Sequence, residues 1–253
     1  MTERTEAFLL RATPYGESDL VVALLTARWG RVAALARGAR RSRRRFGGAL
    51  DYFHLVEAEV RPGRSGLGRL VGVDLLRSYR APRESVDSYR VASHVLEVAL
   101  LGTREGNPDP EIFALVEGAF AALERGADPV SLARVFQARA LAALGYRLPA
   151  ESCTDCGVPH EQDASHRDAA LLCPRCAGPS AARIGLGSLR TLRSAGGLAA
   201  DRLGTIRVTG AVEAELGPLL ESALASALGR RPRSLDGLPS APGVDPFPAT
   251  LIP

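Results

Sequence analysis

The sequence predicts a multidomain α+β fold, in which an N-terminal OB-fold β-barrel is followed by an α-helical domain with an inserted four-cysteine zinc module. Three observations support this prediction. Short apolar runs separated by turn residues fill residues 1–80, apolar residues at helical spacing begin near residue 81, and two Cys-x-x-Cys pairs interrupt the helical part. With 253 residues, 46% of them hydrophobic, the chain can build more than one core.

The first domain, residues 1–80, is expected to contain five short strands. From Val56 to Val60, small apolar residues alternate with glutamate, which is the period of a strand with one buried face. Glycine-containing turns separate the runs. Five short strands in about 80 residues fit a small closed barrel such as an OB-fold. The expected strands are Glu6–Thr13, Asp19–Thr26, Arg31–Arg37, Asp51–Arg61 and Gly68–Leu75.

The second domain, residues 81–235, is expected to be helical. Apolar residues recur every three to four positions from Val86 to Leu100. Asn107-Pro108 and Asp128-Pro129 each place a capping residue before a proline, which predicts the start of a helix. The four-cysteine module is expected at about 151–180. It is followed by a helix at Ser188–Ser194, an extended stretch at Thr205–Val208 and a helix at Ala211–Leu228. The Pro- and Gly-rich tail, 236–253, is expected to be disordered.

The four cysteines form the most specific pattern in the chain. Cys153 and Cys156 make one Cys-x-x-Cys pair, Cys173 and Cys176 make the other, and sixteen residues separate the pairs. This spacing is typical of a structural zinc site, which has no open position for a substrate because four thiolates complete the tetrahedron. Two disulfides or a redox pair are the alternatives.

The histidines within the module do not change this expectation. His160 and His166 lie between the two cysteine pairs and could replace a thiolate. Because the set of four sulfur ligands is already complete, we expect both to be solvated loop residues.

Arginine is concentrated in one segment of the first domain. Residues 37–45, called the arginine segment below, hold six arginines, and no acidic residue occurs between Asp19 and Asp51. Six like charges this close face solvent or meet phosphates, for which the arginine fork is well suited. The expected nucleic-acid contacts are Arg37, Arg40, Arg41, Arg43, Arg44 and Arg45.

Aromatic residues follow the arginine segment closely. Phe46, Tyr52 and Phe53 could offer stacking surfaces to unpaired bases, as aromatic residues do in OB-fold proteins that bind single strands. The alternative is that they belong to the barrel core. The charge balance agrees with a polyanionic partner, since residues 1–80 carry 15 arginines against 8 acidic residues, whereas residues 81–253 carry 17 against 20.

Composition and motifs argue against several classes of protein. The chain has no lysine, which excludes a lysine Schiff base and a Walker-type phosphate loop. None of the four histidines lies in a catalytic motif, so we expect no enzyme activity; His54 and His94 are expected to be packed or surface residues. The first residues contain no apolar h-region, so we expect no signal peptide, and no apolar run is long enough to span a membrane.

Several segments, in their order along the chain, resemble the RecO family of bacterial recombination and repair proteins. Two departures are that proline is common in the family where Asp51 stands, and that lysines of the family's basic segment are arginines here. The resembling segments are Tyr15-Gly16-Glu17-Ser18-Asp19-Leu20, Thr26 to Gly30, Gly38-Ala39-Arg40-Arg41, Leu50-Asp51-Tyr52-Phe53, and Leu144-Gly145-Tyr146 followed by Cys153 to Gly157.

The resemblance implies a repair mediator without covalent chemistry, located in the cytoplasm at the nucleoid. Such proteins bind single- and double-stranded DNA, anneal complementary strands, and assist RecA loading at gaps together with RecR. The resemblance also implies that the helical domain receives the C-terminal peptide of the single-strand DNA-binding protein. Candidate arginines for that peptide are Arg134, Arg139, Arg183 and Arg190.

Two other functions are alternatives. A zinc-ribbon protein that binds RNA or the ribosome would also combine a basic barrel with four cysteines. A zinc-dependent hydrolase would need a site with three protein ligands and an open position.

Overall fold

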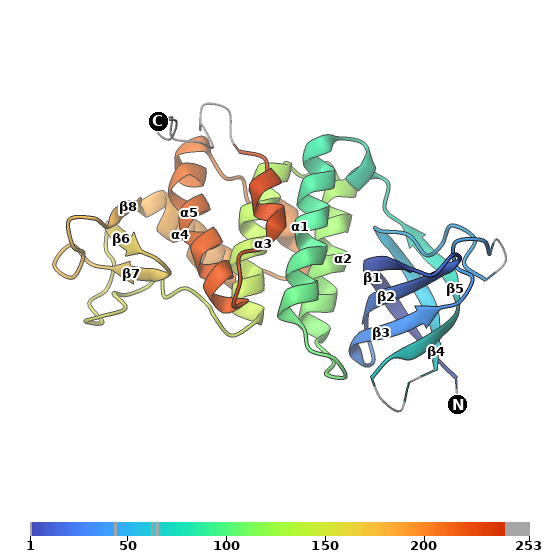
Figure 1. Ribbon diagram of the computed structural model, residues 1–253. Coiled ribbons are helices and arrows are strands. Elements are labelled where there is room, and N and C mark those ends of the chain that lie inside the picture. Colours follow the sequence, from blue (N-terminus) through green and yellow to red (C-terminus); the bar gives the residue numbers. More distant parts are fainter. Residues whose placement is uncertain (1, 43–44, 62, 64–65, 241–253) are drawn as a thin grey trace, which may run out of the picture.

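The N-terminal part of the protein is a closed five-stranded β-barrel (Figure 1). The computed structural model describes residues 2–42, 45–61, 63 and 66–240. Neighbouring strands are antiparallel except for β3 and β5, which close the barrel in parallel through Ala34–Ala36 and Gly68–Leu70. The order is β1-β2-β3-β5-β4, with bounds β1 Glu3–Tyr15, β2 Asp19–Thr26, β3 Gly30–Ala36, β4 His54–Arg61 and β5 Gly68–Ser78.

One predicted strand begins later than expected. Residues 51–53 form a turn, and β4 starts at His54. Phe53 adopts φ 64°, in the left-handed region that bulky residues rarely enter. The sequence pattern predicted a strand here because it does not reveal that Phe53 leaves the barrel and packs against helices.

In the described part of the chain, five α-helices follow the barrel, and Asp or Ser caps begin the first three. The Asp109 and Asp128 carboxylates accept the backbone N–H groups of Ile112 and Ser131. The second helix therefore begins at Pro110, two residues beyond the expected Asn107-Pro108 start. The bounds are α1 Val86–Gly102, α2 Pro110–Glu124, α3 Pro129–Ala143, α4 Leu186–Gly196 and α5 Gly210–Ala227, with 3-10 helices η1 Ala81–Arg83, η2 Ala200–Thr205 and η3 Arg233–Gly237.

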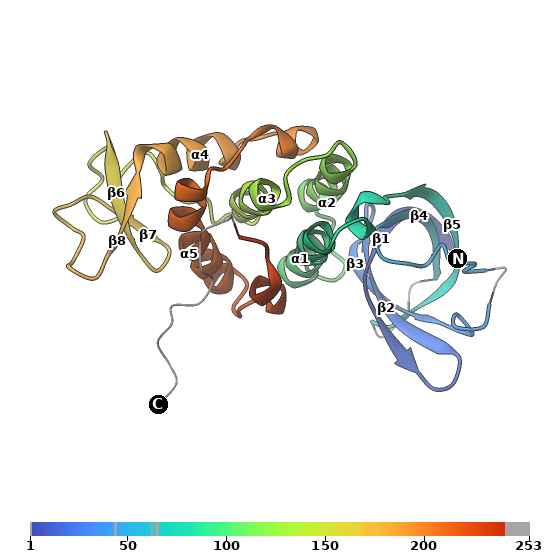
Figure 2. The same cartoon turned by 90° about the horizontal axis from the view of Figure 1, so that it is seen from above.

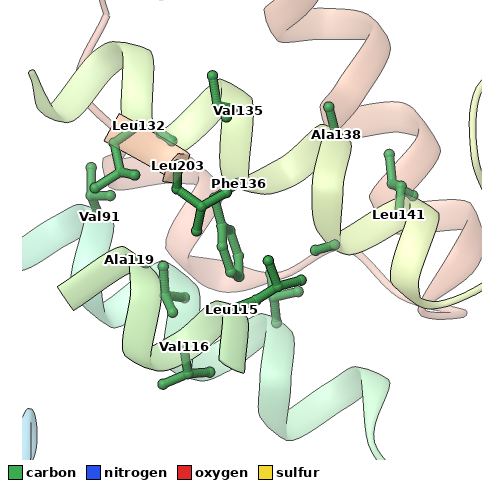
Figure 3. Packing of buried hydrophobic residues seen from close by; sticks show 14 of the residues in the cluster. Val91, Leu115, Val116, Ala119, Leu132, Val135, Phe136, Ala138, Leu141 and Leu203 are labelled. Carbon is green, nitrogen blue, oxygen red and sulfur yellow. The ribbon is translucent and has the colours of Figure 1, made fainter. Parts of the chain in front are cut away.

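Helix α3 lies at the centre of the helical domain, with the other four helices around it (Figure 2). Ten of its fifteen residues are buried. Phe136 of α3 points toward α2 beside Leu115, while Leu203 of η2 completes the packing (Figure 3). The stretch 205–208, expected to be extended, begins inside η2 and continues extended only from Ile206.

The barrel and the helices share one hydrophobic core. Phe8 of β1 packs against Phe113 and Phe120 of α2, with ring centroids 5.2 and 5.7 Å apart. On the other side of this interface, the α1–α2 loop approaches so closely that a Cβ on Gly30 would lie 1.9 Å from the Asn107 carbonyl oxygen. Only glycine fits there, so the position of the barrel against the helices is well defined.

The cysteine module lies at the end of the molecule opposite the barrel (Figure 1). It contains a three-stranded antiparallel sheet in the order β7-β6-β8, which the sequence analysis did not predict. The strands are β6 Asp163–Arg167, β7 Ala170–Leu172 and β8 Ala182–Gly185.

The expected disordered tail begins within ordered structure. Helix η3 includes Asp236 and Gly237, and the rest of the tail from residue 241 lies outside the described residues. Within the part of the chain that the structure describes, no helix combines the length and apolar character required to cross a membrane.

Candidate nucleic-acid interface and metal centre

The arginine segment forms a loop between β3 and β4 on the barrel. Arg37, Arg40, Arg41 and Arg45 are exposed there. Arg43 and Arg44 lie outside the described residues. Tight turns build the loop, since the Gly38 carbonyl accepts the N–H groups of both Arg41 and Ser42. The structure therefore gathers the four described arginines on one solvent-facing loop.

These arginines have few acidic partners. Among the described residues, the one carboxylate within 4.0 Å of the segment's guanidinium groups belongs to Glu17, which lies 3.7 Å from Arg41 and is 89% exposed. The other contacts involve backbone carbonyls, from Arg40 to Glu17 and from Arg45 to Arg37. The positive charge is thus left for a partner outside the chain.

The loop is fixed to the barrel although its charges face outward. The Asp19 carboxylate accepts the backbone N–H of Gly38 at 2.7 Å, and the Arg45 carbonyl accepts the N–H of Val73 in β5 at 3.0 Å. Phe46 is 3% exposed and packs in the barrel core. Holding the described parts of the loop in place before a partner binds reduces the loss of conformational entropy on binding.

Arg83 connects the end of this loop to the helical domain. Its guanidinium group donates hydrogen bonds to the carbonyls of Tyr52 and Tyr79 and to the Asp51 carboxylate at 3.0 Å. It also lies over the ring of Phe53, 5.2 Å from the centroid. These contacts hold the turn in which Phe53 takes its left-handed conformation.

The three aromatic residues near the segment are not free stacking surfaces. Phe46 is buried in the barrel, and Phe53 is 2% exposed between Tyr89 and Phe120. Tyr52 is partly buried, and its hydroxyl accepts the backbone N–H of Ala12. The alternative prediction, that these residues belong to the barrel core, is correct for Phe46. Phe53 instead belongs to the core that the barrel shares with the helices.

A neighbouring face of the barrel has the opposite charge. Glu57 of β4 pairs in register with Glu6 of β1 and Asp74 of β5. Arg4 contacts Glu57 at 2.9 Å and Asp74 at 3.7 Å. Glu57 is thus part of an ion-pair network on a wet face, which disfavours a polyanion there and leaves the arginine loop as the basic side of the barrel.

The four cysteines come together at the far end of the molecule. The sulfurs of Cys153, Cys156, Cys173 and Cys176 all lie within 4.8 Å of one another. The Cys156 and Cys173 sulfurs are 3.6 Å apart, far longer than a disulfide of about 2.05 Å. A tetrahedral site with Zn–S bonds of about 2.3 Å places its sulfurs about 3.8 Å apart, so the group fits a metal ion.

Backbone groups prepare the cysteines for metal binding. Burial alone would raise the pKa of Cys153, but backbone N–H groups of Cys173, Cys156 and Asp155 together lower it to about 6. The N–H of Cys176 likewise lowers the pKa of Cys173. Thiolates are the form that binds metal, so the turns favour the ligand state of Cys153 and Cys173. Side-chain hydrogen bonds with Cys156 and Cys173 instead raise the pKa of Cys176 to about 12.

Two histidine expectations need correction. His160 is 4% exposed, and neither ring nitrogen has a hydrogen-bond partner among the described residues, so it is not a solvated loop residue. Burial and the nearby Arg193 lower its pKa. His166 is half-buried on β6. Neither belongs to the group of clustered metal-ligand atoms.

A buried polar network in the helical domain was missed by sequence reasoning. Arg134 is 5% exposed and binds Glu213 at 2.7 Å and Glu221 at 3.2 Å. It also donates to Gln137, whose amide nitrogen lies 3.2 Å from His94 Nε2. Arg134 and Glu213 are 79 residues apart in the sequence, so no local pattern could reveal that they interact.

This network reduces the choice of arginines for a peptide carboxylate. The Arg134 guanidinium group already binds the buried Glu213 carboxylate. Arg139 donates hydrogen bonds to Glu111 and to the Leu198 carbonyl. Arg183 is 78% exposed with an ion pair to Asp163, and Arg190 is exposed. The two arginines on α3 are therefore structural.

Two family models match this chain, one over the barrel and one over the helical domain. The family model described as "Recombination protein O N terminal" matches residues 1–79, and "Recombination protein O C terminal" matches residues 83–236. The chain belongs to the RecO family. It is 34% identical over 235 residues to the DNA repair protein RecO of Geobacter metallireducens, covering 92% of this chain and 95% of that protein.

Other RecO proteins show similar agreement. The chain is 36% identical over 235 residues to DNA repair protein RecO of Geobacter sulfurreducens, with 92% of this chain and 95% of that protein covered. It is 41% identical over 202 residues to RecO of Anaeromyxobacter sp. strain K, with 76% and 79% covered.

The segments that resemble the RecO family have clear positions in this structure. Asp19, at the end of the β1–β2 turn, holds the first turn of the arginine segment. Gly145 has φ 85° and ends α3, while the Tyr146 N–H returns to the Leu141 carbonyl at 2.7 Å. Both segments build the loops that position the arginines and the cysteine module.

Proposed function

We propose that the protein is a mediator of DNA repair and homologous recombination that binds single- and double-stranded DNA and anneals complementary strands. Membership of the RecO family supports this role. The observation that carries the proposal is the arginine segment, whose described guanidinium groups face solvent on a loop that is itself anchored to the barrel.

The physical basis of annealing is charge neutralisation. Two DNA strands repel each other through their phosphates, and arginine–phosphate contacts release condensed counterions at low salt. A dense arginine surface lowers the repulsion between strands held close to it. No covalent step is required, and we propose that the protein is not an enzyme.

We further propose that the cysteine group holds Zn²⁺ and that this ion stabilises the module. Four thiolates in this geometry suit zinc and leave no ligand position for substrate. The ion would connect the turn before β6 to the turn after β7. The first turn is already bonded to β7 through Thr154 and Leu171.

The proposed partners are those of a recombination mediator. RecR and RecA would act with the protein at DNA gaps, in the cytoplasm near the nucleoid. The single-strand DNA-binding protein would offer its acidic C-terminal peptide to the helical domain. Of the four arginines considered for that peptide, Arg183 and Arg190 are the accessible ones.

Competition between nucleic acids tests the proposal against RNA binding. A labelled single strand of DNA bound to the full chain is displaced by unlabelled DNA or by structured RNA of equal length, and annealing of two complementary DNA strands is followed in parallel. We expect DNA to compete better and annealing to accelerate. Stronger competition by structured RNA, without annealing, would instead support a zinc-ribbon RNA-binding protein.

A further inference from the structure

A cavity of about 310 Å³ lies between the barrel and helix α1. Leu10 of β1 and Leu96 and Leu100 of α1 contribute its apolar lining, and Phe53 and Tyr89 lie beside them. The volume is at the lower end of the range for small-molecule sites. Nothing in the proposed arginine–phosphate contacts uses this cavity.

Tyr89 offers the cavity an accessible aromatic surface. The side chain is 51% exposed although it belongs to the first turns of α1. Its ring packs edge-to-face on Phe53, with centroids 5.5 Å apart and planes at 88°. Because Phe53 is locked by Arg83 and Phe120, Tyr89 is supported in place without being covered.

The charges around the cavity favour a polyanionic strand. Arg11 lines it, is exposed, and has no carboxylate within 4.0 Å among the described residues. The one acidic residue in the lining, Glu97, accepts the backbone N–H groups of Arg233 and Ser234. Its negative charge is therefore largely directed at helix η3.

Strand β1 connects the cavity to the arginine segment. Arg11 lies at the cavity, and the turn after β1 contains Glu17 and Ser18, whose carbonyls accept hydrogen bonds from Arg40. From Arg11 to the end of β1 at Tyr15 the extended chain rises about 13 Å, and the turn follows directly. Single strands occupy about 4–16 nucleotides on an OB-fold, so one strand can reach both places.

We propose that this cavity receives an unstacked base of a single-stranded nucleic acid, with the base against Tyr89 and the adjacent phosphate near Arg11. This inference rests on the proposed function and extends it. Phosphate contacts alone bind single strands and duplexes alike. A base pocket gives the protein a preference for unpaired strands, because bases in a duplex are already stacked and paired.

Abasic DNA tests the pocket without changing charge. Fluorescence anisotropy compares a single strand of thymidines with an abasic strand of the same length, and a duplex serves as third ligand. Wild-type protein is expected to prefer the strand with bases. Tyr89→Ala should lower affinity for that strand about tenfold, within the range for loss of one stacking contact, and leave duplex affinity and the salt slope unchanged.

Three further variants control for folding and for the general loss of an aromatic residue. Ser93→Phe fills the cavity without deleting a contact and should reproduce the effect of Tyr89→Ala. Tyr89→Phe keeps the ring and should restore the preference for bases. Tyr146→Ala removes a tyrosine that is 56% exposed beyond the end of α3, and it should bind as wild type.

The outcomes separate this inference from the proposed function. If Tyr89→Ala and Ser93→Phe both fold, by thermal unfolding, and still distinguish the two single strands as wild type does, the base pocket is wrong while DNA binding stands. If wild-type protein binds none of the three DNAs, the proposed function itself fails.

Discussion

The arginine segment and the cysteine module are both dense clusters of one residue type in loops, but their side chains point to different partners. The cysteine sulfurs turn toward one another and can share one metal ion. The arginines turn outward, while backbone contacts such as Asp19 to Gly38 fix their loop. A cluster that completes its own interactions stabilises the fold, whereas a cluster held in place with its charges unpaired is suited to binding.

Loss of the cysteine cluster should have the largest effect on stability. Replacing Cys153 and Cys173 by serine is expected to abolish metal binding and unfold the module, because metal-binding free energy is folding free energy in such sites. Metal analysis and thermal unfolding of the full chain measure this. Ser180→Ala, at an exposed residue just beyond the second pair, is the control. A metal-free double variant with unchanged thermal unfolding would contradict a structural role.

Loss of the buried ion pair between Arg134 and Glu213 should also have a large effect on stability. Arg134→Ala leaves the Glu213 carboxylate buried without its partner and should cost about 3–5 kcal/mol of unfolding free energy. Replacing both residues, Arg134→Met with Glu213→Leu, should recover much of that loss. Urea unfolding measures both. Equal destabilisation by the single and double variants would show that the ion pair is not the cause.

His94 should make the helical domain sensitive to acid. Burial, with Arg134 adding to it, lowers its pKa to about 3 from the ordinary 6.5. Between these values only the unfolded chain binds the proton, so stability from this group is complete above pH 6.5 and declines by about 1.4 kcal/mol per pH unit as pH falls toward 3. His94→Gln should show a flatter decline in urea unfolding at several pH values. An identical slope would refute this account.

Arg83 should have the smallest effect, because its contacts are with Asp51, Tyr52 and Phe53, beyond the end of the arginine segment. Arg83→Ala removes the contacts to Asp51 and Tyr52 and should lower the unfolding free energy by about 1–2 kcal/mol. DNA affinity should fall modestly with no change in salt slope, since no phosphate contact is deleted. Arg80→Ala, an exposed neighbour, is the control. A change of salt slope in Arg83→Ala would mean that Arg83 itself contacts phosphate.

Local patterns in the sequence were sufficient for much of the fold. Short apolar runs between turn residues predicted the five barrel strands, and capping pairs such as Asp128-Pro129 predicted helices. The spacing of the four cysteines alone predicted that they form one metal site, and their sulfurs do lie together. These features depend on residues close in sequence, whose preferences are visible without tertiary structure.

The features that sequence analysis missed depend on distant contacts. Phe53 has a strand-like sequence context, yet packing against Phe120 and Tyr89 holds it in a left-handed turn. Arg134 was one of four candidate arginines for a peptide carboxylate, but Glu213 meets it across the helical core. Tertiary packing decides which side of a cluster is exposed and which side of a helix is buried. A single sequence does not contain this information.

The salt dependence of DNA binding tests the central claim most directly. One variant replaces Arg40, Arg41 and Arg45 of the segment by alanine. The control replaces Arg28, Arg147 and Arg183, which are each more than half exposed but have carboxylates within 4.0 Å. Both variants lose the same charge, so they differ in where the arginines lie and in how many of them have a carboxylate partner.

For single-stranded DNA, we expect the segment variant to reduce the slope of log K against log salt by about 2, from about 0.7 per lost phosphate contact. The control variant should leave the slope close to that of wild type. Equal slopes for the two variants would contradict the account, because the arginine segment would then contribute only to net charge.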